Sequence, residues 1–543
     1  MTRNLDLPPG STHTLARWVD LAPDPLEAYR RLTDSAERRD TLLLESGAAD
    51  KRPTQSLIVV DAAVRATSRR REVVVEALGT NGAAVIAMLA RRFEPQGRVT
   101  SQQADRVVLQ FPPGPERADD STRIRAASPL DVLRALGPQQ RLVQSPARGC
   151  VICAGVFAYD LLDNYEPLPE AATDPLEYPD YSFWLAETIV RIDHRARRTQ
   201  IACNVFGSSD REAVSRAYHD ASRRMGDIIH TCEAVARTGR VVPPAVSRRP
   251  VPPEFAPPDL DDARYAALVE SLKERVRAGD VFQIVPSRTF AAPCPRPLAT
   301  YAALRQLNPS PYMFYVAAPD HTLLGASPEA AVKVKSDDQG RRIAQIRPIA
   351  GTRPRGHNEH GEIDHDLDNR LEVELRSHEK EVAEHMMLID LARNDIARVS
   401  KPGTRYVDEI LTTERYSHVM HLVSNVRGEL ADDLDALHAY QASMNMGTLV
   451  GAPKVRAAQL LRQHEPKRGP YGGAVGYLTE DGELDTAIII RSAVVKHGQA
   501  YVRAGAGVVY DSDPQLEADE TRRKAASVLT ALAASHERED DHG

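Results

Sequence analysis

The chain has 543 residues, of which 42% are hydrophobic and 27% are charged, and its formal net charge is −7. This length exceeds the size at which one hydrophobic core stops growing, so we expect at least two lobes. The acidic balance and the lack of an apolar run near the roughly 20 residues that cross a bilayer give no reason to expect nucleic acid or membrane as a partner.

The five cysteines form an odd set in a chain whose start, MTRNLDLPPG, has no secretory signature. This usage predicts free thiols in a reducing compartment, and therefore a cytoplasmic location. Cys150 and Cys153 form a C-x-x-C segment, but no second pair or nearby histidine completes a zinc set. We expect both to pack in the core.

Residues 1–238 have the pattern of a mixed α and β lobe. β-branched runs predict strands at Ser56–Arg65 and Glu72–Leu78, and helical spacing predicts a helix at Glu212–Ala236. Prolines then recur between residues 239 and 260 without helical or strand periodicity, which predicts a linker between two domains.

We expect a second domain at residues 261–535 and a polar tail at 536–543. Helical patterns cover Leu260–Arg277, Glu372–Val399 and Gln515–Ala534. Strand patterns cover Val281–Val285, Met313–Ala317 and Ala330–Val334. Because the strands cluster and do not alternate strictly with helices, an α+β fold is favoured over a doubly wound parallel sheet.

Two pairs of glutamates in the second domain have a spacing that could suit a metal site. Glu381 and Glu384, like Glu517 and Glu520, are three residues apart, which places each pair on one face of a helix. Asp513-Pro514 supplies a cap for the second helix. Taken singly, such pairs are usually solvated surface charges, but two facing pairs would need a cation, and oxygen ligands suit Mg²⁺.

Two further segments carry candidate anion contacts. The strand pattern of Tyr501–Asp511 breaks at Gly505-Ala506-Gly507, where backbone N–H groups can approach an anion, although an ordinary turn fits the same residues. Arg491 lies within the apolar run AIIIRSAVV and needs an anionic partner there. Lys524 follows Glu520 by four residues, the spacing of a helical ion pair.

Several long motifs occur in a fixed order across the second domain. They are PIAGTRPRG (348–356), LIDLARND (388–395), RYSHVMHLVS (415–424), GTLVGAPK (447–454), YGGAVGY (471–477), DTAIIIRS (485–492) and RAGAGVV followed by EADET. The chain resembles the chorismate-utilising enzymes over residues 262–534, and within them it is most similar to the large subunit of anthranilate synthase. The segment LLLES (42–46) of the first lobe strengthens that likeness.

The resemblance implies a lyase with two intertwined lobes, in which large, mainly antiparallel sheets pack as a sandwich with helices outside. It implies that ammonia and chorismate give anthranilate and pyruvate in tryptophan biosynthesis. Glu384 and Glu520 would bind Mg²⁺, with Glu381 and Glu517 in support. Glu329 would protonate the leaving C4 oxygen, and His421 would assist the elimination of pyruvate.

The same resemblance implies a chorismate site. Tyr471 and Arg491 would bind the enolpyruvyl carboxylate, Arg491 by a forked contact. The backbone N–H groups of Gly505, Ala506 and Gly507 would bind the ring carboxylate. Three further residues would complete the pocket: Gly351, Thr352 and Lys524.

Two positions separate the possible reactions. Relatives that make aminodeoxychorismate carry a nucleophilic lysine where this chain has Ala350, and relatives that add water use a lysine at the position of Gln283. Alanine and glutamine favour addition of ammonia. Two alternatives remain open: an aminodeoxyisochorismate synthase, and a tryptophan-sensing regulator without turnover.

Partners and regulation also follow from the resemblance. The chain has no G-x-C-x-G-x-Q segment, so a separate glutamine amidotransferase subunit would supply ammonia, in a hetero-oligomer expected to be a heterotetramer. Tryptophan would inhibit from a site between the lobes. Gln55 replaces a lysine of some relatives near that site, and Met444–Met446 departs from their proline-containing loop. The inhibitor-site residues would be Glu45, Ser46, Pro311, Tyr312 and Met313.

Overall fold

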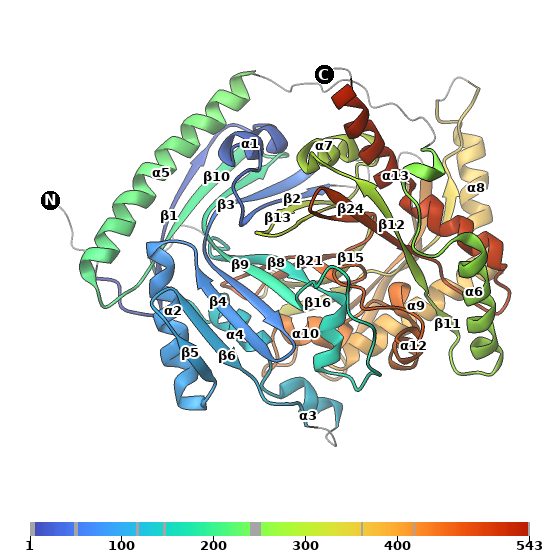
Figure 1. Cartoon of the computed structure of the whole chain (residues 1–543), viewed down its shortest axis with the longest axis horizontal. Helices are drawn as coiled ribbons and strands as arrows, with labels where there is room; N and C mark the ends of the chain where they lie inside the picture. Colours follow the sequence, from blue (N-terminus) through green and yellow to red (C-terminus); the bar gives the residue numbers. More distant parts are fainter. Residues whose placement is uncertain are drawn as a thin grey trace.

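The structure is a computed structural model, and it describes residues 6–47, 53–115, 119–144, 148–238, 251–359, 362–415 and 419–540. Figure 1 shows curved β-sheets in the middle of the molecule with helices around the outside, and strands from both halves of the chain lie side by side. Apart from one short separate pair, the strands form one continuous sheet that bends into two layers at β3 (Pro53–Arg69) and β9 (Tyr181–Asp193), and these layers are described below as the first and second sheets.

The first sheet contains mostly antiparallel neighbours; only β1 and β7 pair in parallel. Its order is β7 (Arg141–Gln144), β1 (Ser11–Val19), β10 (Arg198–Phe206), β9 (Tyr181–Asp193), β3 (Pro53–Arg69), β2 (Thr41–Gly47), β13 (Tyr312–Ala317), β14 (Thr322–Ser327), β23 (Ser492–Lys496), β24 (Gln499–Gly505) and β12 (Ser287–Pro293).

The second sheet is antiparallel throughout. Its order is β5 (Val99–Gln102), β6 (Arg106–Gln110), β4 (Glu72–Ala77), β3, β9, β8 (Ile152–Phe157), β21 (Ala474–Thr479), β22 (Leu484–Ile488), β15 (Ala330–Ser336), β16 (Arg342–Ile346) and β19 (Val419–Glu429). Strands β17 (Ile349–Pro354) and β18 (Tyr406–Arg415) also pair with β19, and β11 (Gln283–Ile284) pairs separately with β20 (Gly451–Ala452).

Strands β3 and β9 pass from one sheet to the other because their pairing shifts register between Val59 and Val64. Before the shifts β3 pairs with β2, and after them it pairs with β4. Bulges of this kind bend a strand and increase its twist. The β2–β13 and β8–β21 pairs then join the first lobe to the second, so the expected intertwining of the lobes is confirmed.

The inner faces of the two sheets form one of the hydrophobic cores. Leu42, Phe314 and Val316 from the first sheet meet Ile152 and Val475 from the second, all of them buried. Alternate residues of each strand supply this layer, as expected for a sandwich. The predicted α+β class is therefore confirmed.

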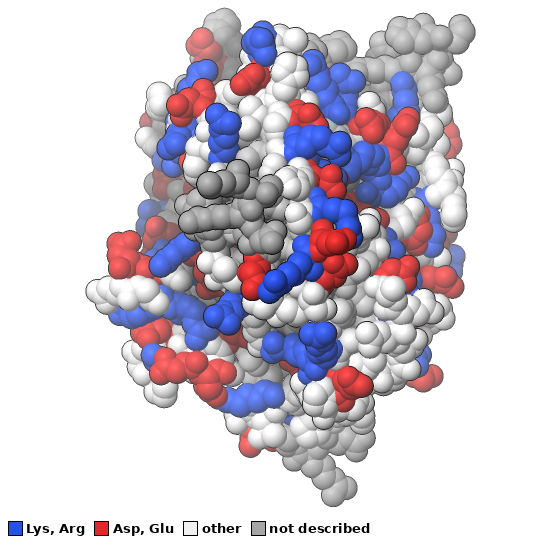
Figure 2. Space-filling model, turned by 90° about the vertical axis from the view of Figure 1, so that its left-hand side faces the viewer, with Lys and Arg blue, Asp and Glu red and all other residues white. Residues whose placement is uncertain are grey.

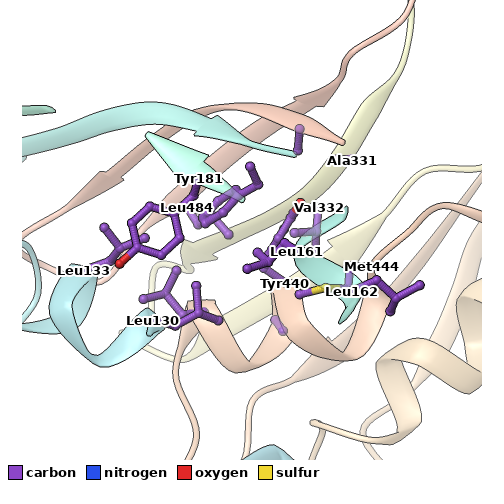
Figure 3. Close-up of a cluster of buried hydrophobic side chains, with 14 of the residues drawn as sticks. Leu130, Leu133, Leu161, Leu162, Tyr181, Ala331, Val332, Tyr440, Met444 and Leu484 are labelled. Carbon is purple, nitrogen blue, oxygen red and sulfur yellow. The ribbon is translucent and has the colours of Figure 1, made fainter. Parts of the chain in front are cut away.

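Helices cover the outer faces over two further cores. Figure 3 shows part of the one beneath the second sheet, where Leu130, Leu133 and Tyr440 pack against Val332 and Leu484 of that sheet. The helices are α1 (Pro25–Leu32), α2 (Thr80–Phe93), α3 (Asp120–Arg125), α4 (Leu130–Leu136), α5 (Arg211–Thr238), α6 (Asp262–Arg277), α7 (Pro297–Leu307), α8 (His365–Ser377), α9 (Glu379–Ala397), α10 (Ala436–Ser443), α11 (Gly447–Val450), α12 (Lys454–Leu461) and α13 (Pro514–Asp540).

Three sequence predictions differ from the structure. The helix expected at Glu372–Val399 is two helices, because His378 ends α8 and caps α9 through its Nδ1, 3.4 Å from the N–H of Glu381. The strand expected at Val281–Val285 is only the two residues of β11. The tail expected at 536–543 begins inside α13, which continues to Asp540.

Most of the expected linker, residues 239–250, lies outside the described residues. Its C-terminal end is attached to β12, where the N–H of Asp259 donates to Thr289 O at 2.9 Å. None of the helices in the described part of the chain combines the length and hydropathy that crossing a bilayer requires. On the face shown in Figure 2, basic and acidic side chains are interspersed.

Candidate functional site

The predicted catalytic residues come from turns and helix ends of the second domain. Glu329 lies in the turn between β14 and β15, Arg491 in the turn between β22 and β23, and Gly505 at the end of β24. Arg491 has a φ of 51°, in the left-handed region that non-glycine residues rarely adopt. Strain of this kind often marks a functional turn.

The two glutamate pairs lie on α9 and α13, and the pairs interact. Burial raises the pKa of Glu384, and the neighbouring Glu381 and Glu520 carboxylates act in the same direction. Burial likewise raises the pKa of Glu517, again with Glu520 contributing. Like charges raise one another's pKa only when they are close, so the predicted meeting of the pairs is supported.

Each pair also has a cation in ion-pair contact with one of its carboxylates. Lys524 lies 2.6 Å from Glu520, the ion pair that its spacing predicts, and Arg353 lies 3.1 Å from Glu381. The cap of α13 is as expected, because Asp513 Oδ1 accepts from the N–H groups of Gln515 and Leu516 at 2.9 Å.

The residues fit a metal ion that a substrate helps to hold. Within the described ranges, no group of three or more His, Cys, Asp or Glu side chains is assembled as a metal cage. Mg²⁺ commonly takes only one or two protein carboxylates and completes its shell with water and substrate oxygens. Such an ion would neutralise the two glutamate pairs, in each of which burial and like charges raise the pKa of one member, Glu384 or Glu517.

The glycine turn lies beside the helix that carries Glu520. Lys524 Nζ donates to Gly505 O at 3.0 Å, which ties the turn to α13. A Cβ at Gly505 would meet Pro286 O at 2.7 Å, and one at Gly507 would meet Gln283 Nε2 at 2.6 Å. The turn therefore requires glycine at position 505, where the close atom belongs to the backbone, whereas at position 507 the close atom is the flexible end of Gln283, which lies against the turn.

Glu329 and Arg491 form an electrostatically coupled pair. Burial raises the pKa of Glu329 to about 8, although the positive charges of Arg491 and Lys524 oppose the rise. Burial lowers the pKa of Arg491, against the influence of Tyr471, Glu520 and Glu329. A glutamic acid that keeps its proton at neutral pH is suited to general-acid work.

Tyr471 lies within electrostatic reach of a buried ionic cluster that sequence reasoning missed. Glu465 accepts from Ser287 N at 2.6 Å, from Arg468 Nε at 2.9 Å and from Arg503 Nη2 at 2.8 Å. Ser287 pairs in register with Gly505. The only sequence signal was a run of charges, HEPKR, which is typical of a surface loop.

His421 is positioned by the strand that faces it. Its Nδ1 lies 3.0 Å from both Gly351 O and Thr352 Oγ1. Because a carbonyl oxygen only accepts, Nδ1 carries the hydrogen and Nε2 is the basic nitrogen of the neutral ring. Burial lowers the pKa of His421, which favours that neutral form. A Cβ at Gly351, whose φ is +68°, would lie 3.0 Å from Glu381 Oε2.

The five residues predicted for an effector line one cavity of about 740 Å³ between the sheets. Ser46 and Tyr312 are neighbours across the β2–β13 pair, and Ser46 Oγ lies 3.2 Å from Thr54 Oγ1. Gln55, opposite Ser46 on β3, lines the same cavity. The volume is in the range of ordinary ligand sites.

The side chains of Glu45 and Met313 are oriented differently from those of Ser46 and Tyr312. Alternate residues of a strand face opposite sides, and Leu44 and Tyr312 pack on the inner layer of the sandwich. Glu45 instead accepts from Tyr301 Oη at 2.7 Å and from Arg305 Nη2 at 3.0 Å, both on α7. Met313 packs in the same outer core as Tyr301. Their side chains therefore support the cavity wall from behind.

The cavity and the catalytic residues share a wall. Pro328 and Ala330 line the cavity on either side of Glu329. On β19, Asn425 lines the cavity, while His421 lies four residues earlier. The cavity and the catalytic residues therefore adjoin through residues 328–330 and β19.

Two remaining predictions concern the core. All five cysteines are free and buried, as expected, and burial raises the pKa of Cys150 to about 11. The peptide bond between Met444 and Asn445 is cis, and Asn445 Nδ2 donates to Tyr159 O at 2.8 Å. Residues 416–418 of the RYSHVMHLVS motif lie outside the described residues.

Comparisons with known proteins agree with this geometry. A family profile described as chorismate binding enzyme matches residues 87–530. Anthranilate synthase component 1 of Vibrio parahaemolyticus is 46% identical over 530 residues, which cover 97% of this chain and 94% of that protein. The pyocyanine-specific anthranilate synthase component 1 of Pseudomonas aeruginosa is 47% identical over 518 residues, covering 95% and 93% of the two chains.

The chain is also similar to a solved structure. The crystal structure of anthranilate synthase component I from Streptococcus pneumoniae TIGR4 superposes with a TM-score of 0.65 at 28% identity, covering 88% of this chain and 92% of the other. With a family match over most of its length and relatives that it covers almost end to end, the chain belongs to the family of chorismate binding enzymes.

Proposed function

We propose that the chain is the large subunit of an anthranilate synthase, which converts chorismate and ammonia to anthranilate and pyruvate. One observation carries the proposal: Glu329, whose pKa burial raises to about 8, is influenced by Arg491 and Lys524, and Lys524 pairs with Glu520, which in turn influences Glu384 of the other glutamate pair. The names of the relatives agree with it.

Glu384 and Glu520 would hold Mg²⁺, with Glu381 and Glu517 behind them. When bound, the ion supplies positive charge that orients the ring carboxylate and polarises the ring. The backbone N–H groups of Gly505 and Gly507 would add donors for that carboxylate, while the N–H of Ala506 donates to Pro286 O at 3.2 Å. Lys524 adds a positive charge beside this turn.

Tyr471 and Arg491 bind the enolpyruvyl carboxylate at the other end of the substrate. Arg491 suits this role because its guanidinium is partly stripped of water and its fork matches a carboxylate. Gly351 and Thr352 close the remaining side and hold His421 in its orientation.

Two proton transfers follow from the geometry. Ammonia bonds to C2 while the C4–O bond breaks, and Glu329 gives its proton to the departing oxygen, which leaves as water. His421 Nε2 then assists the loss of the C2 proton while the enolpyruvyl C–O bond breaks and pyruvate leaves. The ring becomes aromatic in that step.

The reaction class depends on two side chains. Ala350, on β17 opposite Leu422, offers no nucleophile, and Gln283 beside Gly507 cannot act as a base toward water. Both favour ammonia as the group that adds. A synthase that stops at aminodeoxyisochorismate would share these features but would release no pyruvate.

A separate amidotransferase subunit supplies the ammonia in this proposal, in a hetero-oligomer that we expect to be a heterotetramer. The thiols of the chain support it, because all five are buried, and burial raises the pKa of Cys203 and of Cys232 to about 12. A thiol kept protonated in the core cannot attack glutamine.

Tryptophan inhibits by binding the cavity between the sheets in this proposal. Ser46 and backbone groups bind its charged end, and Tyr312 contributes an aromatic wall for the indole. Because Pro328 and Ala330 belong to this cavity, binding acts on the segment that carries Glu329. Tryptophan and chorismate should weaken each other's binding by the same factor.

Product identification tests the proposal. The purified chain, given chorismate, Mg²⁺ and ammonium, should form fluorescent anthranilate and an equal amount of pyruvate, but should form neither from glutamine. Aminodeoxyisochorismate without pyruvate would favour the alternative synthase. Tryptophan binding without turnover would favour a regulator, and turnover of glutamine by the isolated chain would exclude the need for an amidotransferase.

A further inference from the structure

The cavity between the sheets has a second end, away from Ser46. Its walls there carry Lys333 and Lys335 of β15 and Asn425 and Arg427 of β19. A neighbouring cavity of about 520 Å³ shares Lys333, Lys335 and Arg427. The combined space exceeds what one amino acid would fill.

The cavity as a whole carries an excess of positive charge, since six of its lining residues are Lys or Arg and four are Asp or Glu. Lys333 and Lys335 both approach one oxygen, Oδ2 of Asp485, at 3.3 and 3.9 Å. The Nε of Arg427 lies 3.4 Å from Oδ2 of Asp408. Glu409 lines the cavity as well, so these three cations face three carboxylates at this end. Other charges at the rim are already matched, since Arg341 pairs with Asp337 at 2.7 Å and Glu429 with Lys401 at 2.7 Å.

Asn425 supplies independent support for a ligand. Its side chain is 1% exposed and belongs to the cavity wall, and among the described residues neither Nδ2 nor Oδ1 has a hydrogen-bond partner. Leaving such a buried group unpaired costs about 1–3 kcal/mol, and native proteins rarely tolerate it. An oxygen ligand would accept from Nδ2.

We propose that this end of the cavity is a second binding site, for a small dianion such as a phosphate or a dicarboxylate. Lys333, Lys335 and Arg427 supply its charge, and Asn425 donates a hydrogen bond. The site is distinct from the catalytic residues and adjoins the effector end, because the Lys333 ammonium lies 5.0 Å from the centre of the Tyr312 ring.

Calorimetric titration tests the proposal. Inorganic phosphate and succinate are titrated separately into the full chain, without Mg²⁺ and at constant ionic strength. At least one should bind saturably, and whether phosphate or succinate binds tells the two ligand chemistries apart. Lys333→Gln and Arg427→Gln should each weaken binding by at least about tenfold, or about 1.4 kcal/mol. Lys333→Arg, which keeps the positive charge, should retain most of the binding affinity.

Two controls locate the site. Arg223→Gln removes an exposed cation of α5 that pairs with Asp220 at 3.5 Å, and should change nothing. Arg491→Gln removes a carboxylate ligand of the catalytic site and should leave dianion binding intact. The proposal is overturned if neither probe binds saturably, or if Arg491→Gln abolishes binding while Lys333→Gln preserves it. Catalytic activity enters none of these readouts.

Discussion

The catalytic cluster and the cavity between the sheets lie on opposite sides of Pro328–Ala330, and they treat their polar groups differently. In the catalytic cluster several polar groups have partners, since Lys524 contacts Glu520 and Gly505 and His421 contacts Gly351, whereas Gln283 Oε1 beside the glycine turn has none among the described residues. In the cavity wall, Asn425 has no partner among the described residues.

This difference fits the separate requirements of catalysis and of effector binding. Catalysis needs groups already oriented and with pKa values already shifted, because reorganisation during the reaction costs rate. An effector site needs interactions that form only when the effector binds. Polar atoms that have no partner in the empty site can form such interactions. Substitutions on the catalytic side should therefore affect turnover steeply, and those on the cavity side should affect regulation.

The largest effect is expected from the metal-binding carboxylates. Glu384→Gln and Glu520→Gln should each lower turnover by orders of magnitude while the fold persists, because neutral amides bind Mg²⁺ poorly. The measurement is anthranilate formation across a Mg²⁺ titration, with circular dichroism for the fold. Glu379→Gln, an exposed change on the same helix, is the matched control. Near-normal activity of either variant at saturating Mg²⁺ would show that its carboxylate is no ligand.

The next effect concerns Glu329. The protonated carboxylic acid is the active form of Glu329, and burial raises its pKa to about 8. The value of kcat/KM should therefore fall as pH rises through about 8. Glu329→Gln should lose about 10²–10⁴ in rate and lose that limb of the profile. The check is kcat/KM from pH 6 to about 10 for both proteins. An unchanged alkaline limb in the variant would assign the limb to another group.

Local signals in the sequence were sufficient for much of this site. The Asp513-Pro514 cap and the three-residue spacing of Glu517 and Glu520 depend only on neighbours along the helix. Motif likeness assigned Arg491 and Tyr471 to one substrate carboxylate, and in the structure each of them influences the pKa of the other.

Long-range contacts were beyond the sequence. Glu465 meets Ser287 across 178 positions of the chain, and no periodicity reports such a contact. The break between α8 and α9 was missed because His378 interrupts no hydrophobic pattern, and only its cap geometry ends the helix. The direction of Glu45 needed the strand's register, which depends on pairing with β13.

A tenfold effect is expected on the cavity side. Ser46→Phe should fill the effector end and raise the inhibitory tryptophan concentration by at least about tenfold, or about 1.4 kcal/mol, with uninhibited turnover nearly unchanged. Ser46→Ala, which removes only the hydroxyl, should change inhibition less. Inhibition curves at fixed chorismate give both values. Equal sensitivity of Ser46→Phe and wild type would place the effector elsewhere.

The smallest effect should come from Glu45, because its carboxylate faces α7 and not the cavity. Glu45→Gln keeps the shape but removes a charge from Arg305, which retains Asp24 at 3.0 Å. Losing one charged hydrogen bond should cost about 1–3 kcal/mol of unfolding free energy, measured in urea. Inhibition should shift by less than in Ser46→Phe, since the variant weakens only the support behind the wall. If Glu45→Gln instead abolished inhibition without lowering stability, the carboxylate would have to turn into the cavity and touch the effector, and the alternation of β2 would not describe the bound state.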